Sequence, residues 1–408
     1  MSHEPDPYRS LRYADFRWLL VASTFAFIAA QIQSLVLGWQ IYARTHDPLS
    51  LGWVGLAEAV PFLALTLPGG WAADRWNRRT LSIFAVGLSL IGAVLLVALA
   101  HLPGKALPWH YYAIQALAGL SRALSRPATQ SLGTDLVPRD TYANAATWRS
   151  SCFHFSMVIG PAVGGVLFAT WGARFAYETV AALLAAAIVS LTLVRYRPSK
   201  SSHSPLRSSG LAAGVRFVFA NRLILSALSL DLFAVLFGGA VALLPAFASD
   251  VLHVGPAGLG VLRTAPAIGA IAMSFVIAHR RPSERAGVTL LWSVAAFGIT
   301  WILFALSHNL ALSVILLALS GAVDNVSVIL RATLVQTQTP ADMMGRVQAV
   351  NGFFIGSSNE LGAFESGLAA RLLGVVPSVV FGGCMTLVVV GVMARTVPEL
   401  RRLTRVTG

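Results

Sequence analysis

Apolar runs of about 20 residues recur along the whole chain and are separated by short polar segments. A run of that length crosses the hydrocarbon core of a bilayer as a helix. The pattern predicts twelve such helices, at about 18–42, 51–73, 80–101, 109–134, 142–170, 174–194, 223–248, 257–278, 286–307, 309–334, 345–372 and 376–397. The first run is too long for a removable signal peptide, so we expect it to remain as a span.

One longer polar segment interrupts the series in the middle of the chain. It contains Pro198, Pro205, many serines and several basic residues, a composition typical of a flexible linker. Its later part, residues 211–220, favours a short helix at the membrane interface. The chain is therefore predicted to consist of a first half at 1–195, a cytoplasmic linker at 196–221 and a second half at 222–408, each half with six helices.

Composition supports a membrane protein. Of the 408 residues, 56% are hydrophobic and 12% are charged, and the mean hydropathy is +0.70. Soluble domains carry roughly 25% charged residues, and disordered chains are poor in hydrophobic residues, so both classes are excluded. Cys152 and Cys384 both lie in apolar stretches, so no disulfide framework is indicated.

The basic residues fall mainly on one side of the predicted membrane. If the N-terminus is inside, 21 lysines and arginines lie in cytoplasmic segments and 4 lie on the opposite side. Basic loops face the cytoplasm, so we expect a bacterial inner membrane protein with both termini cytoplasmic. The same distribution accounts for the net charge of +13 without a nucleic-acid partner.

The sequence repeats itself at an offset of 202 residues. Segment 137–149 is similar to segment 339–351, and the same offset relates Arg78 and Arg79 to Arg280 and Arg281. It also relates three pairs of glycines, which are Gly160 and Gly362, Gly165 and Gly367, and Gly172 and Gly374. One offset across so many features predicts two pseudo-symmetric halves in an all-α membrane protein.

A glycine and several charges cluster in the loop between the second and third predicted spans. Residues 70–79, GWAADRWNRR, resemble the major facilitator signature of that loop, G-x-x-x-D-x-x-G-R-R, and the candidate gating residues are Gly70, Asp74, Arg75, Arg78 and Arg79. Gly70 is expected to allow close helix packing, and Asp74 to accept hydrogen bonds from a helix N-terminus. Asn77 replaces the motif's second glycine, and we expect it to tolerate a left-handed backbone there. The alternative is a loop that is merely basic for topology.

A second motif lies inside the fifth predicted span. The segment comprises Gly160, Pro161, Gly164 and Gly165, in which the proline is expected to bend the helix and the glycines to let another helix approach. It resembles the glycine-proline motif of major facilitator antiporters, although Ser156 stands where the family has an earlier glycine. A packing kink with no implication for transport direction is the alternative.

Together with segments 11–17, 68–79, 125–128, 336–340 and 345–346, these motifs resemble the major facilitator branch of enterobactin-exporter-like and transmembrane secretion effector proteins. The resemblance covers nearly the whole chain. It implies the major facilitator fold, with the substrate site between two six-helix halves. It also implies a proton-driven exporter of siderophores, drugs or related amphipathic molecules.

Charged residues inside the predicted spans are the candidates for proton coupling or substrate binding, because each costs at least about 2.5–3.5 kcal/mol to insert. The candidates are Asp231, Glu58, Arg126, Arg122, Asp324, Glu360 and Arg263, with Glu365, Arg149 and Arg331 as further buried charges.

Each of these charges also has a structural interpretation. Asp231 either carries a proton or forms a structural pair with an arginine such as Arg263. Arg126 resembles in position the arginine near the antiporter proton relay, or it forms a salt bridge or reaches the interface. Glu360 and Glu365 are five residues apart and point in different directions, so one of them either has a role in transport or pairs with Arg371. Asp135 and Asp342, at loop edges, are expected to be helix caps.

No enzyme signature is present, since the sequence contains no GK[ST] phosphate loop, HExxH or GxSxG motif. We therefore expect a secondary transporter that uses the proton gradient and no cofactor or metal. Its expected partners are a small-molecule substrate, protons and membrane lipid, and we expect it to function as a monomer. The alternatives are an importer or facilitator on the same fold, or a membrane sensor or enzyme.

Overall fold

The computed structural model describes residues 6–102, 107–196, 208–279, 285–340 and 343–403. Contacts divide the chain into two compact units: unit 1 comprises Met1–Gln40 and Ala57–Pro205, and unit 2 comprises Ile41–Leu56 and Leu206–Gly408. The division into 1–195, 196–221 and 222–408 stays a prediction, and residues 197–207 of that linker lie outside the described residues.

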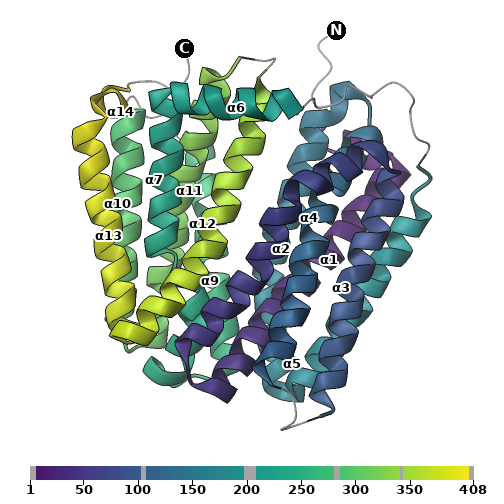
Figure 1. Cartoon of the computed structure of the whole chain (residues 1–408), viewed down its shortest axis with the longest axis horizontal. Coiled ribbons are helices and arrows are strands. Elements are labelled where there is room, and N and C mark those ends of the chain that lie inside the picture. The colour runs from purple at the N-terminus through teal and green to yellow at the C-terminus, as the bar shows by residue number, and fades with distance from the viewer. Residues whose placement is uncertain (1–5, 103–106, 197–207, 280–284, 341–342, 404–408) are drawn as a thin grey trace. The chain divides into compact units, whose positions relative to one another are not determined.

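The long helices that begin in the first half of the chain are labelled in Figure 1. They are α1 (Ala14–Thr45), α2 (Pro48–Arg75), α3 (Arg78–Ala100), α4 (Pro108–Asp135) and α5 (Tyr142–Leu193), with short 3-10 helices η1 (Arg9–Arg12) and η2 (Arg139–Thr141). Residues of α1 after Gln40 and of α2 before Ala57 belong to unit 2.

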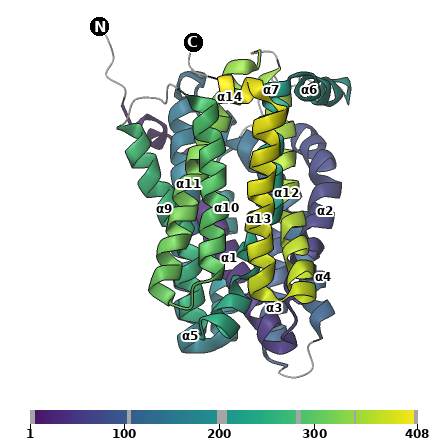
Figure 2. The ribbon, with the colours of Figure 1, turned by 90° about the vertical axis from the view of Figure 1, so that its left-hand side faces the viewer.

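The remaining elements of unit 2 are also helical. They are α6 (Ser208–Ala220), α7 (Arg222–Gly238), η3 (Ala240–Leu243), α8 (Leu244–Ala246), η4 (Phe247–Val251), α9 (Pro256–Ala278), α10 (Ala286–Ala305), α11 (Leu310–Gln338), α12 (Met344–Leu373), α13 (Val375–Thr396) and α14 (Pro398–Arg402). Helix α6 lies across the ends of the long helices of its unit (Figure 1), where a short helix was predicted. Figure 2 shows α10, α11 and α13 side by side, with α14 at one end of them.

All twelve predicted spans fall on helices of the described residues. Within those residues, nine helical segments are long and apolar enough to cross a membrane, and one of them, α5, covers two predicted spans. The other two predicted spans are α4 and α12, which are more polar because they carry Arg122, Arg126, Glu360 and Glu365. The most polar helices are thus those that hold many of the candidate residues.

The internal repeat is visible in the backbone. Gly172, inside α5, has φ 79°, and Gly374, between α12 and α13, has φ 96°. These residues are related by the 202-residue offset, and a positive φ is accessible to glycine without steric cost. His46 and His253, which are not related by this offset, also have positive φ, at 47° and 50°, in the turns after α1 and η4. Each reverses the chain before the next long helix.

The seventh predicted span differs from the expected continuous helix. Helix α7 stops at Gly238, and the chain continues through η3, α8 and a π-helical turn, η4, to Val251. Two consecutive glycines, Gly238 and Gly239, have poor helix propensity, and Pro245 has no N–H to donate. A Cβ on Gly238 would lie 2.6 Å from Thr386 Oγ1, so the glycine also allows α7 to pack against α13.

Apolar side chains lie both inside and outside the helices. In unit 2, buried residues of α7, α10, α11 and α14 form one core, which includes Leu230, Val294, Leu334 and Leu400. Large apolar side chains are also exposed, such as Phe275 at 66% and Trp292 at 69%. An exposed apolar exterior on helices of this length is what lipid, and not water, solvates.

Candidate functional site

Glu58 and Arg122 form an ion pair inside unit 1. The carboxylate of Glu58 in α2 lies 2.7 Å from the Arg122 guanidinium in α4, and it also accepts a hydrogen bond of 2.7 Å from Gln115. Arg122 further stacks over the ring of Phe62, at 4.2 Å from its centroid. Two predicted candidates are therefore brought together and neutralise each other, and the hydrogen bond and the cation–π contact stabilise the pair further.

The close approach of α2 and α4 makes this pair possible. A Cβ on Gly119 would lie 2.1 Å from the carbonyl oxygen of Glu58, and a Cβ on Gly69 would lie 2.3 Å from that of Ala123. Pro127 has no N–H to bond Ala123 through the helix, so this carbonyl is left for a neighbour. Glycines and a proline thus place the Glu58 side chain opposite Arg122, one turn after Gly119.

Arg126 lies one turn after Arg122 on α4, and Arg149 of α5 contacts α4 further along; neither has a carboxylate partner among the described residues. Arg126 is exposed, and its side chain makes no hydrogen bond or ion pair with the described residues. Arg149 of α5 donates to the backbone carbonyl of Gln130 at 3.3 Å and lies against Gly133. No acid contacts either guanidinium within the described parts of unit 1.

Asp231 and Arg331 form the corresponding pair inside unit 2. Asp231 of α7 and Arg331 of α11 are 7% and 5% exposed, and their side chains form an ion pair. The structural alternative was a pair with an arginine such as Arg263, and in the structure an arginine does pair with Asp231, namely Arg331 of α11. Sequence spacing gave the depth of each residue in its span but not which helices face each other.

Asp324 adds a second acid near this pair. It lies two helical turns before Arg331 on α11 and within electrostatic range of both Asp231 and Arg331. It is half-buried and makes no hydrogen bond or ion pair with described residues. Two carboxylates therefore lie near one guanidinium, an arrangement in which a proton on either acid changes the balance of charge.

The acids of α12 have other surroundings. Glu360 and Glu365 are both half-buried, and Glu365 forms no ion pair in the part of the chain that the structure describes. The alternative that one of them pairs with Arg371 stays a prediction, and Arg371 itself lies 3.4 Å from Asp47 in unit 2. Asp47 and the hydrogen bond from Tyr42 to Asp250 were missed, because nothing in the sequence relates these distant segments.

The loop between α2 and α3 differs from its expected geometry at two positions. No atom of the described residues lies within 4 Å of where a Cβ on Gly70 would be, so the expected close packing belongs to Gly69 instead. Asn77 has φ −61° and not a left-handed backbone, and its side chain accepts from the N–H groups of Arg79 and Thr80 as the N-cap of α3. Asn77 thus serves as a helix cap at this position. Asp74 is exposed and bonds no residue of the described chain.

The arginines of this loop tie it to the ends of other helices. Arg78 forms a 2.6 Å ion pair with Asp135 at the end of α4, and Arg79 donates to the carbonyl of Leu191 at 2.9 Å. Tyr196 also donates to Asp135, at 2.8 Å. Arg75 lies 5.4 Å from the centroid of the Trp71 ring. The interpretation of Asp135 as an ordinary helix cap is therefore wrong, because its carboxylate binds Arg78 and Tyr196.

Tyr196 keeps its proton in this cluster. Burial, the hydrogen bond to Asp135 and the negative charge of that carboxylate raise the pKa of Tyr196 to about 12, against a smaller opposite effect of Arg78. The hydroxyl therefore donates to Asp135 at any physiological pH. The second-half copy at Arg280 and Arg281 lies outside the described residues, as does Asp342.

We expect Asp135→Asn to lower thermal stability and slow transport. Arg78 and Asp135 are only 14% and 22% exposed, so loss of this charged hydrogen bond should cost about 1.5–3 kcal/mol. Thermal unfolding and initial transport rates of the purified variant measure both effects. Asp140→Asn is the matched control, because Asp140 pairs with Arg9 at 57% and 50% exposure. An exposed pair contributes about 0–1 kcal/mol, and equal effects of the two substitutions would contradict the prediction.

The glycines of the fifth span pack against α1. A Cβ on Gly160 would lie 2.4 Å from Gln31 Cβ, and one on Gly164 would lie 3.2 Å from Ile32 Cα. Pro161 and Gly165 are buried in the same stretch of α5, and the one residue with non-helical dihedrals inside α5 is Gly172. The structure thus shows close helix packing at this motif, and its role in transport stays a prediction.

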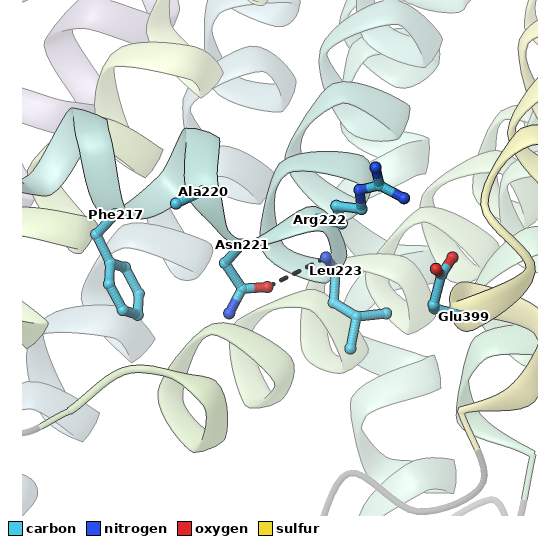
Figure 3. A pocket seen from close by; sticks show the side chains of 6 residues that line it. All are labelled: Phe217, Ala220, Asn221, Arg222, Leu223 and Glu399. Atoms are coloured by element: carbon cyan, nitrogen blue, oxygen red, sulfur yellow. Dashed lines mark hydrogen bonds between the residues drawn. The ribbon is translucent and has the colours of Figure 1, made fainter.

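A pocket of about 420 Å³ opens where α6 meets α7 (Figure 3). Its lining is Phe217, Ala220, Asn221, Arg222, Leu223 and Glu399, and none of these is a predicted candidate. Asn221 accepts from Leu223 N–H and so caps α7. The pocket thus belongs to the junction of the linker helix with unit 2, and not to either buried ion pair.

The helices and their buried ion pairs define a polytopic membrane protein with charged groups in its spans. The sequence profile described as the Major Facilitator Superfamily matches residues 19–363. The chain therefore belongs to the Major Facilitator Superfamily, and it is a secondary transporter of small molecules and not an enzyme.

Individual relatives agree with this assignment. The chain is 30% identical over 398 residues to the enterobactin exporter EntS of Citrobacter koseri, covering 95% of this chain and 92% of that protein. The identity and coverage are the same for the enterobactin exporter of Shigella flexneri. The resemblance to this branch is thus confirmed.

Solved structures of other transporters share the fold. A POT family transporter in complex with a thioalcohol-conjugated peptide has a TM-score of 0.74 at 12% identity, covering 94% of this chain and 96% of that one. A bacterial homologue of the human lysosomal transporter Spinster has a TM-score of 0.73 at 16% identity, covering 98% and 99%. At such identities the likeness establishes the fold and nothing further.

Proposed function

We propose that the protein is a proton-coupled exporter, an antiporter that moves small amphipathic molecules such as siderophores or drugs out of the cell by alternating access. It would lie in the bacterial inner membrane, with both termini cytoplasmic and as a functional monomer. The relatives named enterobactin exporters support the direction and the kind of substrate. The uneven distribution of basic loop residues supports the orientation.

The buried pair of Asp231 and Arg331, with Asp324 close by, carries the proposal of proton coupling. A proton on Asp231 removes the charge that holds Arg331, so α7 and α11 interact differently in the protonated and deprotonated states. If the two conformations of the transporter differ in this interaction, protonation shifts the equilibrium between them. Each charge that moves through the membrane field contributes about 2.3 kcal/mol per 100 mV.

Glu58 with Arg122 offers a second, separate ion pair in unit 1. Because Gln115 and Phe62 also hold these side chains, a proton on Glu58 leaves Arg122 with a cation–π partner. We assign Glu58 a supporting role. Asp231 shares its arginine with a second acid, Asp324, whereas the further partner of Glu58 is the neutral amide of Gln115. The energy source is the proton gradient, and no cofactor enters the proposal.

Vesicles of opposite orientation test the proposal. In everted membrane vesicles with an acidic interior, the protein should accumulate enterobactin, and a protonophore should abolish the accumulation. Vesicles of the original orientation, with the outside acidic, should not accumulate it. Proton-driven uptake only in the latter vesicles would make the protein an importer, and accumulation in neither would contradict proton-driven transport of this substrate.

A further inference from the structure

Among the described residues, the helices α4 and α5 of unit 1 carry arginines that outnumber the acids paired with them. Arg122 is neutralised by Glu58 at 2.7 Å, but Arg126 and Arg149 contact no carboxylate in the described residues. Lipid-exposed or buried arginines in a span are costly and normally have a counter-ion or face water. Within the part of unit 1 that the structure describes, two guanidiniums thus have no anion that would offset this cost.

The arginines lie along one polar face of α4. Residues 115, 119, 122, 126 and 133 recur at helical spacing and share that face. The face packs on Glu58 through Gly119, and Arg149 of α5 reaches it at Gly133, where a Cβ would lie 3.0 Å from Arg149 Nη1. From residue 122 to residue 133 the helix rises about 16 Å, so the three guanidiniums follow one another over a short stretch.

Arg126 is the accessible member of this row. It is exposed, whereas Arg122 and Arg149 are half-buried. Arg122 lies four residues away on the same face, and two cations at that spacing repel each other. Guanidinium groups bind carboxylate, sulfonate and phosphate oxygens through paired hydrogen bonds, and an anion beside Arg126 would relieve the repulsion.

Unit 2 does not repeat this arrangement. The 202-residue offset relates Arg122 to Asp324, so symmetry-related positions carry opposite charges. Around Asp324 the neighbouring charges are Asp231 and Arg331, so that cluster has an excess of acid. The excess of cations is thus particular to the interior of unit 1, and it is not the loop charge that sets topology.

We infer that Arg126, with Arg149 of α5 one to two turns further along α4, binds an anionic group of the transported molecule, such as a carboxylate, sulfonate or phosphate. This inference rests on the proposed transport function and adds the charge of the substrate to it. Unit 1 binds the anionic group, and the acid cluster of unit 2 carries the proton. The same oxygen chemistry is present in an anionic lipid headgroup, so the experiment separates these two sources.

A matched pair of probes tests the charge. Purified full-length protein in nanodiscs of zwitterionic lipid is titrated with 1-pyrenebutyrate, which is anionic, and with neutral 1-pyrenebutanol, and energy transfer from tryptophan reports binding. Arg126→Gln should weaken binding of pyrenebutyrate by about tenfold or more, because a charged hydrogen bond is lost. Pyrenebutanol should bind both proteins equally. Arg139→Gln, which changes an exposed arginine outside the spans, should have no effect.

Further variants keep the result interpretable. Arg126→Lys retains the positive charge and should keep part of the affinity for pyrenebutyrate. Thermal unfolding shows whether Arg126→Gln folds. If it does not, Arg149→Gln takes its place and should also weaken binding of pyrenebutyrate. Equal affinity of the wild type, Arg126→Gln and Arg149→Gln for pyrenebutyrate would overturn the inference. Competition by phosphatidylglycerol in the nanodisc, lost in Arg126→Gln, would assign the site to lipid and also overturn it.

Binding and coupling can fail independently in these experiments. If pyrenebutyrate binds through Arg126 but no substrate accumulates in everted vesicles, the anion site stands and the proposed proton coupling is wrong. If enterobactin accumulates but Arg126→Gln binds both pyrene probes like the wild type, the exporter proposal stands and the anion site is wrong.

Discussion

Replacement of Asp231 by asparagine should abolish proton-driven efflux. Asparagine has nearly the shape of aspartate but cannot take up and release a proton. In proteoliposomes with an imposed pH gradient, the variant should fail to accumulate substrate against its concentration gradient, while the wild type does so. The expected effect is a complete loss of pH-driven accumulation and not a change of rate, because the coupling group itself is removed.

Stability has to be measured with this variant. Asp231 and Arg331 are almost completely buried, and removal of one partner of a buried pair costs about 3–5 kcal/mol because the other charge remains. Asp324 lies near enough to Arg331 to offset part of this cost. The double variant Asp231→Asn with Arg331→Gln removes both charges, and such neutral replacements are often tolerated.

The double variant separates folding from coupling. It should express and unfold at nearly the temperature of the wild type, and it should still pass substrate down a concentration gradient. It should not respond to a pH gradient. A folded Asp231→Asn protein that keeps full pH-driven accumulation would remove Asp231 from the mechanism, and Asp324 and Glu58 would be the next carboxylates to test.

The sequence was sufficient to predict the helices and the repeat. The apolar runs predicted helices at all twelve positions where the structure has them, since a bilayer imposes a minimum length on every crossing segment. The 202-residue offset anticipated that Gly172 and Gly374 occupy equivalent positions, and both have a positive φ. The length of an apolar run and the offset of a repeat are both visible in the linear sequence. They can therefore be read without the tertiary structure.

Partners across helices could not be predicted in the same way. Asp231 was expected to lie deep in its span and to face an arginine, but depth does not determine which helix lies opposite, so the sequence did not single out Arg331 as its partner. Gly69 makes the close contact expected of Gly70, since neighbouring residues on a helix point about 100° apart. Asp135 gave no signal beyond its place at a loop edge, because its partners come from two other parts of the chain.

Alanine at the glycines between α9 and α11 should strongly destabilise unit 2. A Cβ on Gly269 would lie 1.8 Å from the carbonyl oxygen of Ala318, and one on Gly321 would lie 2.0 Å from that of Pro266. Each distance is far below van der Waals contact, and the obstructing atoms are backbone, so the two helices would have to move apart. Overpacking of this kind costs about 1–3 kcal/mol per site.

Gly391→Ala in α13 is the matched control, because none of the described residues comes within 4 Å of its Cβ position. Alanine there should stabilise the helix by about 0.5–1 kcal/mol, so the control and the test have opposite signs. Thermal unfolding followed by tryptophan fluorescence measures both as shifts of the apparent midpoint. Unchanged midpoints for Gly269→Ala and Gly321→Ala would contradict the close approach of α9 and α11.

The same substitutions should reduce transport through the charges that the glycines position. Asp324 follows Gly321 by three residues, and in unit 1 Arg122 follows Gly119 by three residues. Gly119 approaches the Glu58 carbonyl as closely as Gly321 approaches that of Pro266. Gly119→Ala should therefore displace Arg122 from Glu58 and lower both stability and transport. A normal midpoint with normal transport in Gly119→Ala would show that this contact does not hold the ion pair in place.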